Sequence, residues 1–115
     1  MVAVFVKLKI ESASKIITNS DMTESFQIGD AYRVYGIEVY DGETYYIIFD
    51  GHHLLSIPAA MFNIVDNNVP NTWKVQYNVD GLKLYPELFY SEYFFDRFSD
   101  YDPYLRELFV SNIDI

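Results

Sequence analysis

Two adjacent histidines, His52 and His53, are the first residues that suggest chemistry, because Asp50 stands just before them. A carboxylate beside an imidazole is half of a metal site or of an acid–base pair. Neighbouring side chains in an extended chain point to opposite sides, so the two histidines are poorly arranged to bind one ion. No third ligand follows at a familiar spacing. We expect a turn here and no metal site.

The other residue types that catalysis requires form no motif. The chain has no cysteine, which excludes disulfides, thiolate metal sites and thiol redox chemistry. It has no G-x-S-x-G nucleophile motif, and its five glycines stand singly instead of forming a phosphate-binding loop. The many carboxylates occupy no recognisable catalytic arrangement. The sequence therefore predicts a protein that is not an enzyme and that has no cofactor.

The clearest structural pattern is a β-hairpin over residues 29–50, in which two tyrosine-rich apolar runs meet at Asp41-Gly42. Asp-Gly supplies the two positive-φ positions of a type I′ turn. A two-residue turn fixes the register of the two strands. The expected cross-strand pairs are Tyr40 with Glu43, Glu38 with Tyr45, Ile37 with Tyr46, Tyr35 with Ile48, and Arg33 with Asp50.

This register sorts the hairpin side chains onto two faces. The cleaner core face carries Tyr35, Ile37, Val39, Thr44, Tyr46 and Ile48. The other face, apolar near the strand base and acidic near the turn, carries Tyr32, Val34, Glu38, Tyr40, Glu43, Tyr45, Ile47 and Phe49. Gly36 lies within a strand and predicts a bulge or a point of close packing.

Short strands and two helices complete the prediction. Alternation predicts strands over residues 2–10, 54–57, 62–66 and 73–77, with Trp73 in the core and a turn at Asp80-Gly81. Helical spacing follows over about 86–98, and Asp102-Pro103 marks the start of a last helix. We expect a single α+β domain over residues 1–115, with strands over about 2–85 and helices over about 86–113. The sheet is expected to be a curled antiparallel sheet or a small Src-homology-3-like barrel.

The charge of the chain narrows the choice of partner. Seventeen acidic and eight basic residues give a net charge of −9, and all of the excess lies after residue 20. An acidic surface disfavours direct nucleic-acid binding and anionic membranes, and it favours a basic protein partner. It also simply keeps a tyrosine-rich protein in solution. The first ten residues are too short and too alternating for a signal peptide or a membrane span, which predicts a cytoplasmic protein.

Two groups of residues are candidates for binding a partner. Tyrosine suits binding interfaces because it combines a large contact area with few rotatable bonds and a polar tip. The first group lies at the hairpin tip and contains Tyr40, Asp41, Glu43 and Tyr45. The second lies near the helices and contains Glu92, Asp96, Asp100 and Asp102. In the alternative interpretation, the tyrosines only flank the core.

Three runs carry a resemblance to a known class of proteins: AYRVYGIEVYDGETYYIIFD, IPAAMFNIVDNNVPNTWKV and LYPELFYSEYFFDRF. Over residues 28–98 the sequence resembles small bacterial immunity proteins that neutralise polymorphic or contact-dependent toxins. The segment Gly51-His52-His53-Leu54 departs from that pattern. The shared residues are expected to be structural: Tyr32, Val34, Gly36, Ile37, Pro58, Ala59, Phe62, Val65, Asp66 and Trp73.

The resemblance implies a cytoplasmic immunity protein that binds a cognate toxin, expected to be a basic nuclease domain. Two alternatives remain open from the sequence. One is another acidic interaction module, such as a phage-encoded or regulatory mimic of DNA. The other is a small enzyme or ligand-binding barrel, in which His52 or His53 would converge on carboxylates. The oligomeric state is not predicted.

Overall fold

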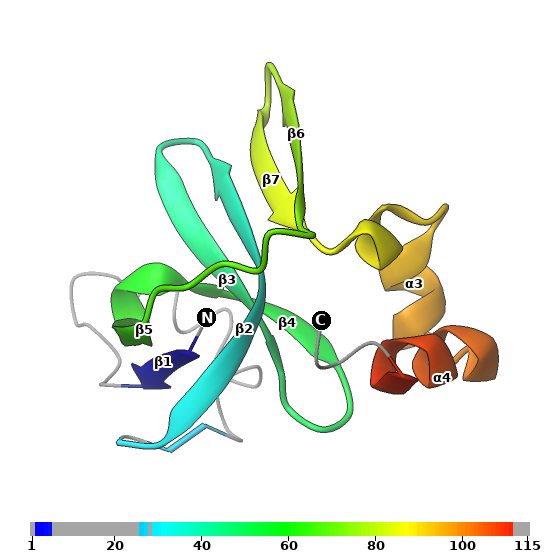
Figure 1. The fold of residues 1–115 in the computed structure, drawn as a ribbon, viewed down its shortest axis with the longest axis horizontal. Coiled ribbons are helices and arrows are strands. Elements are labelled where there is room, and N and C mark those ends of the chain that lie inside the picture. The colour runs from blue at the N-terminus through cyan, green and yellow to red at the C-terminus, as the bar shows by residue number, and fades with distance from the viewer. Residues whose placement is uncertain (1, 6–25, 28, 112–115) are drawn as a thin grey trace.

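The computed structural model describes residues 2–5, 26–27 and 29–111 and confirms the α+β prediction. An open, curled antiparallel sheet of seven described strands is followed by two α-helices (Figure 1). The described strands do not close into a barrel. The elements are β1 (Val2–Phe5), β2 (Ala31–Tyr40), β3 (Glu43–Phe49), β4 (Leu54–Pro58), η2 (Ala59–Met61), β5 (Phe62–Asp66), β6 (Lys74–Asn78), β7 (Gly81–Tyr85), η3 (Glu87–Tyr90), α3 (Phe94–Ser99) and α4 (Pro103–Ser111).

Strand β2 organises the sheet because it pairs with three other strands. One of its edges pairs with β3. The other edge is divided: residues 31–33 pair with β1, and residues 37–40 pair with β7. The sheet therefore divides along β2 into two parts. One continues through β1 to β5, in the lower half of Figure 1, and the other continues through β7 to β6, in its upper half.

The predicted hairpin is confirmed at its tip and wrong at its base. Asp41 and Gly42 have φ angles of 53° and 75°, and Tyr40 pairs with Glu43, as a type I′ turn requires. The register shifts between Val34 and Gly36, so that Val34 pairs with Ile48. The expected pairs of Tyr35 with Ile48 and of Arg33 with Asp50 do not form. The bulge predicted at Gly36 is the cause, since one extra residue moves every later side chain to the other face.

Each face of the sheet contributes to a hydrophobic core of its own, whereas the sequence suggested one clean core face. The strand core contains Ala3, Phe26, Val34, Ile48, Ile57, Met61, Phe62 and Trp73. The helix core contains Ile47, Tyr85, Phe89, Phe94, Phe98, Leu105 and Phe109. The bulge places Val34 in the strand core and lets Tyr35 pack against Phe109 of the helix core, with ring centroids 5.2 Å apart.

The C-terminal segment differs from the single helix predicted over about 86–98. It forms η3 and then α3, and the break comes at Tyr93, whose φ of 55° is left-handed. A non-glycine residue in this conformation interrupts a right-handed helix. The start of α4 at Pro103 is confirmed, with Asp102 directly before it.

The remaining short elements agree with the sequence to within one or two residues. Strands β4, β5 and β6 occupy the predicted positions, and Trp73 is buried. The turn expected at Asp80-Gly81 lies one residue earlier, because Asn78 pairs with Gly81. Residues 6–10 of the predicted first strand and residues 112–113 of the predicted last helix lie outside the described residues.

Candidate functional site

The tip of the β2–β3 hairpin carries the first group of predicted binding residues on a defined scaffold. The rings of Tyr40 and Tyr45 are stacked, with centroids 5.1 Å apart and planes at 17°. The Tyr45 hydroxyl donates a hydrogen bond to Oε2 of Glu43 over 2.8 Å. Tyr40 and Asp41 are exposed, and Glu43 and Tyr45 are half-buried. The stack and the hydrogen bond hold these side chains in one arrangement before any partner arrives.

The chemistry of Tyr45 supports this arrangement. Burial raises the pKa of the Tyr45 hydroxyl well above its usual value, and the hydrogen bond to Glu43 raises that pKa further. The hydroxyl therefore stays protonated and remains a donor at any physiological pH. The hydrogen bond thereby orients the carboxylate of Glu43 beside a neutral neighbour.

The tip belongs to the sheet face that also bears the helix core, and we call it the helix-side face. Cross-strand pairing places Glu38 beside Tyr45 on β3 and beside Lys83 on β7, so all three side chains share this face. Near the helices the face is covered by Phe89 and its neighbours. Toward the tip no described helix covers it. A continuous strip of acidic, basic and aromatic side chains thus runs from the hairpin tip to the helices.

Glu38 also accepts a hydrogen bond from Tyr85, a residue of the helix core. Burial raises the pKa of the Tyr85 hydroxyl far above its usual value, and a hydrogen bond to Glu38 adds to this effect. Tyr85 is 2% exposed and packs against Phe89 and Phe95, with ring centroids 5.7 and 5.6 Å away. The core therefore supports the polar strip through Tyr85.

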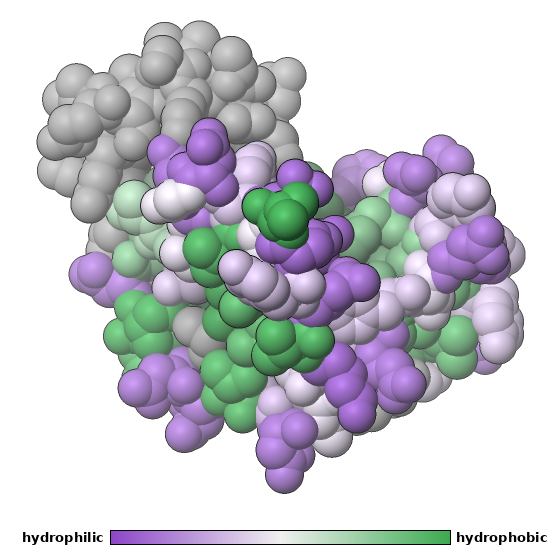
Figure 2. Space-filling model, turned by 90° about the horizontal axis from the view of Figure 1, so that it is seen from above, coloured by the Kyte–Doolittle hydropathy of each residue, from purple (hydrophilic) through white to green (hydrophobic). Residues whose placement is uncertain are grey.

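A groove opens where the strip meets the helical segment. Its volume is about 550 Å³, and it separates the β6–β7 hairpin from η3 and α3. Figure 2 looks down on this end of the molecule and shows a hollow with hydrophobic surface between the hairpin and the helices. The groove is lined by Lys74, Val75, Gln76, Lys83, Tyr85, Phe89, Tyr90, Ser91, Tyr93, Phe94, Phe95 and Asp96. A smaller hollow of about 170 Å³ lies between the two hairpin tips, bordered by Glu38, Tyr40 and Lys83 among others.

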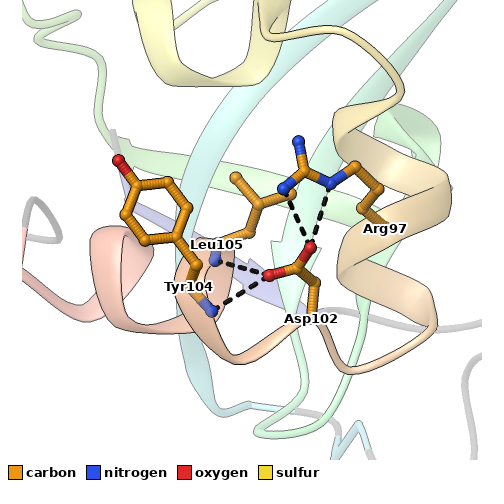
Figure 3. A network of polar contacts seen from close by, with 4 residues as sticks. All are labelled: Arg97, Asp102, Tyr104 and Leu105. Atoms are coloured by element: carbon orange, nitrogen blue, oxygen red, sulfur yellow. Dashed lines mark hydrogen bonds and ion pairs between the residues drawn. The ribbon is translucent and has the colours of Figure 1, made fainter.

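The second group of predicted binding residues is divided by the structure. Glu92, Asp96 and Asp100 are exposed, and Asp96 lines the groove. Asp102 instead caps α4: its Oδ1 accepts hydrogen bonds from the backbone N–H groups of Tyr104 and Leu105 (Figure 3). Its Oδ2 lies 2.9 Å from Nη2 of Arg97. Asp102 therefore links the start of α4 to Arg97 of α3 and has a structural role.

These contacts change the acidity of Asp102. The hydrogen bond from the Leu105 N–H and the bond from Arg97 hold the pKa of the Asp102 carboxyl below its usual value. The carboxylate is the form that accepts both bonds. Its charge is neutralised within the protein, so it contributes less than the exposed acids to any attraction of a basic partner.

The histidines form the predicted turn. The backbone N–H groups of His53 and His52 both donate to Oδ1 of Asp50, over 2.7 and 2.8 Å. Burial opposes ionisation of Asp50, but these two bonds outweigh it and lower the pKa of the carboxyl. Nε2 of His53 lies 3.2 Å from the hydroxyl oxygen of Tyr101. Within the described ranges no group of three potential ligands is arranged to hold a metal ion.

The groove was not predicted from the sequence, although part of it was visible there. Lys74 and Gln76 alternate with Val75 and Tyr77, and such a strand normally buries its apolar side. In the structure that side is open, with Val75 and Tyr77 63% and 77% exposed. Lys74 and Gln76 instead line the groove together with Tyr90. The bond from Tyr90 to the backbone of Lys74 joins residues that are distant in the sequence, so no local sequence pattern predicts it.

Comparisons with known proteins give no relative: no family model, no curated protein and no solved structure matches this chain. The resemblance to immunity proteins therefore stays a prediction. Among the helices that the structure describes, none is both long and apolar enough to cross a membrane.

Proposed function

We propose that this chain is a cytoplasmic, non-enzymatic immunity protein that binds and neutralises a basic protein toxin, with a nuclease domain as the expected target. The observation that carries the proposal is the tip of the β2–β3 hairpin. There, the exposed ring of Tyr40 stacks on the half-buried ring of Tyr45, and the Tyr45 hydroxyl holds the half-buried carboxylate of Glu43. Pre-ordered aromatic side chains bind with little loss of conformational entropy.

The charge of the protein supports the choice of a basic target. A net charge of −9 attracts a cationic surface and speeds its association. The active-site cleft of a nuclease is cationic because it binds phosphates. In the proposed complex, the carboxylates of Asp41 and Glu43 take the place of those phosphates. Asp96 and Asp100, exposed near the helices, extend the negative surface. Aromatic contacts at the tip would then slow dissociation.

Affinity capture from a lysate of the source organism tests the proposal. The tagged protein is incubated at about 50 and about 150 mM salt, and the retained proteins are identified by mass spectrometry. We expect one basic protein to remain at the higher salt, because buried aromatic contacts are not screened. The captured protein is then assayed for nuclease activity with and without stoichiometric amounts of this chain, which is expected to inhibit it.

Two outcomes would count against the proposal. Retention of many basic proteins at low salt and of none at higher salt would show that the charge serves solubility alone. A captured partner whose activity is unchanged by saturating amounts of this chain would show a binding module that does not neutralise its partner.

A further inference from the structure

We propose that the groove between β6 and α3 is a second binding site, which accepts an extended acidic peptide segment of another protein as an added β-strand. This site differs in charge and position from the hairpin tip, and it holds whether or not the chain neutralises a toxin. Three features of the groove lead to this proposal: a strand edge with no described strand beside it, an aromatic floor, and two lysines with no ion-pair partner among the described residues.

The first feature is the outer edge of β6. Among the described strands β6 pairs only with β7, so its other edge has backbone N–H and C=O groups with no strand beside them. All five residues of β6 are exposed. Lys74, Val75 and Gln76 of this strand line the groove consecutively, which places the edge along the groove wall. An exposed edge is a template for an incoming strand.

The second feature is the aromatic floor opposite that edge. Tyr90, Phe94 and Phe95 line the groove, and Phe94 and Phe95 meet edge to face, with centroids 5.2 Å apart. The Tyr90 hydroxyl donates to the backbone oxygen of Lys74 over 2.6 Å, which ties the floor to the base of β6. A volume of about 550 Å³ lies within the range of roughly 300–1,000 Å³ that is typical of ligand sites.

Tyr93 adds to the floor at a conformational cost. Its φ of 55° is left-handed, a conformation that L-residues other than glycine rarely adopt because Cβ crowds the neighbouring carbonyl. Its side chain is 67% exposed and makes no ring contact or hydrogen bond with another described residue. Strained backbone that presents an exposed aromatic ring is typical of binding sites.

The third feature is the charge of the wall. The described arginines are all engaged: Arg97 binds Asp102, Arg106 stacks on Phe98 and Tyr101, and Arg33 lies over Tyr35. The two described lysines, Lys74 and Lys83, have no ion-pair partner among the described residues, and both line the groove.

Two lysines at one site select the charge of the occupant. A lysine on an edge strand discourages pairing with most chains, and an opposing carboxylate removes that barrier. At physiological salt, charges farther away than about 8 Å are largely screened, so most of the acidic surface acts weakly on the groove. Glu38, which pairs with Lys83 across β2 and β7, is the acid that lies beside the lysines. Asp96 on the opposite wall disfavours carboxylates there. The occupant is therefore a strand whose groove-facing side chains combine carboxylates near β6 with an aromatic ring over the floor.

A palindromic probe peptide, acetyl-Thr-Glu-Val-Phe-Val-Glu-Thr-amide, tests the proposal in either strand direction. Its Glu and Phe side chains share one side of a strand, as the groove requires. Fluorescence anisotropy of the labelled probe should saturate with a Kd below about 1 mM. Replacement of both Glu by Lys in the probe should weaken binding about tenfold. Absence of saturation, or equal binding of the Lys probe, would overturn the proposal.

N-methylation of the probe tests for strand pairing itself. Only alternate N–H groups of an added strand point toward its neighbour. N-methylation of one alternate set should abolish binding, and N-methylation of the other set should leave the Kd within about twofold. If both methylated probes bind like the parent peptide, the site does not bind its ligand as a strand.

Protein variants then locate the site. The Lys74→Gln/Lys83→Gln variant should bind the probe about tenfold more weakly. The matched control, Asn63→Asp/Asn67→Asp, has the same change in net charge at exposed positions of β5 and the following loop, and it should bind within about twofold of the unsubstituted protein. Tyr93→Asn removes the ring and introduces a residue type that tolerates the left-handed conformation. It should therefore weaken binding without loss of thermal stability. Equal effects of the lysine variant and the control would refute a site in the groove.

Discussion

Replacement of Gly36 by alanine should destabilise the protein, although a glycine-to-alanine change within a strand is ordinarily favourable. A Cβ atom at Gly36 would lie 2.7 Å from Cδ1 of Tyr85 and 3.2 Å from Cγ1 of Ile47. The preferred separation of two carbon atoms is about 3.5–4.0 Å. Tyr85 is 2% exposed and held among other rings, so it has little room to move.

The expected magnitude follows from two opposing terms. Overpacking a core costs about 1–3 kcal/mol, and the reduced freedom of the unfolded chain returns about 0.4–1 kcal/mol. The free energy of unfolding should therefore fall by about 1–2 kcal/mol, which corresponds to a melting temperature lower by roughly 4–8 °C for a chain of this length. Urea denaturation followed by tyrosine fluorescence and circular dichroism measures this change.

Two further backgrounds make the test specific to the ring of Tyr85. In Tyr85→Phe the ring remains, so the alanine at position 36 should be as damaging as in the unsubstituted protein. In Tyr85→Val the ring is absent, so the alanine should be neutral or stabilising. Stabilisation by Gly36→Ala alone, or an equal loss in both backgrounds, would refute the proposed contact between the bulge and Tyr85.

Three other predictions concern the cores and the polar contacts. Phe98→Ala should lower the free energy of unfolding by about 3–5 kcal/mol because Phe98 is 1% exposed among aromatic rings, whereas Val65→Ala, at a 62% exposed position, should change it by less than about 0.5 kcal/mol; urea denaturation compares the two. The depressed pKa of Asp102 stabilises the folded state above the ordinary value of 3.8, and this stability is lost as pH falls through the lower folded value. Asp102→Asn should therefore show a flatter acid limb in thermal melts below pH 3.8, and an unchanged limb would contradict the stabilisation of the carboxylate by the Leu105 N–H and Arg97. The raised pKa of Tyr45 means that the free energy of unfolding falls as pH rises above the ordinary value of 10.0. Glu43→Gln should move the titration of Tyr45, followed by carbon-13 NMR of its Cζ, to lower pH. No change would show that Glu43 does not bind the hydroxyl.

Features that depend on local chemistry were predictable from the sequence. Asp41-Gly42 specifies a type I′ turn through its backbone preferences alone, and Asp102-Pro103 specifies a helix start through a capping side chain and a fixed φ. Both are confirmed. The candidate residues Tyr40 and Glu43 follow from the turn, because the register beside a two-residue turn admits no shift.

Features that depend on packing between distant segments were not predictable. The bulge at Gly36 was expected, but its effect on register depends on the position of the extra residue, and Tyr85 decides that position by lying against the glycine. The break at Tyr93 had no signal, because tyrosine disfavours the left-handed conformation and no glycine or proline marks the site. The groove arises from η3 folding back against β6, which joins residues that are 16 positions apart, as in the bond from Tyr90 to Lys74.

The central claim is that the hairpin tip binds a basic partner, and a comparison of two charge variants tests it most directly. Asp41→Lys/Glu43→Lys alters the tip. Asp30→Lys/Glu107→Lys makes the same change in net charge at exposed positions before β2 and on α4. The Kd for the captured partner is measured for both by isothermal titration calorimetry at about 150 mM salt. The tip variant should bind at least tenfold more weakly than the control, since close charge pairs contribute about 1.5 kcal/mol or more. Equal affinity of the two variants would contradict the claim and leave the tip as a structural turn.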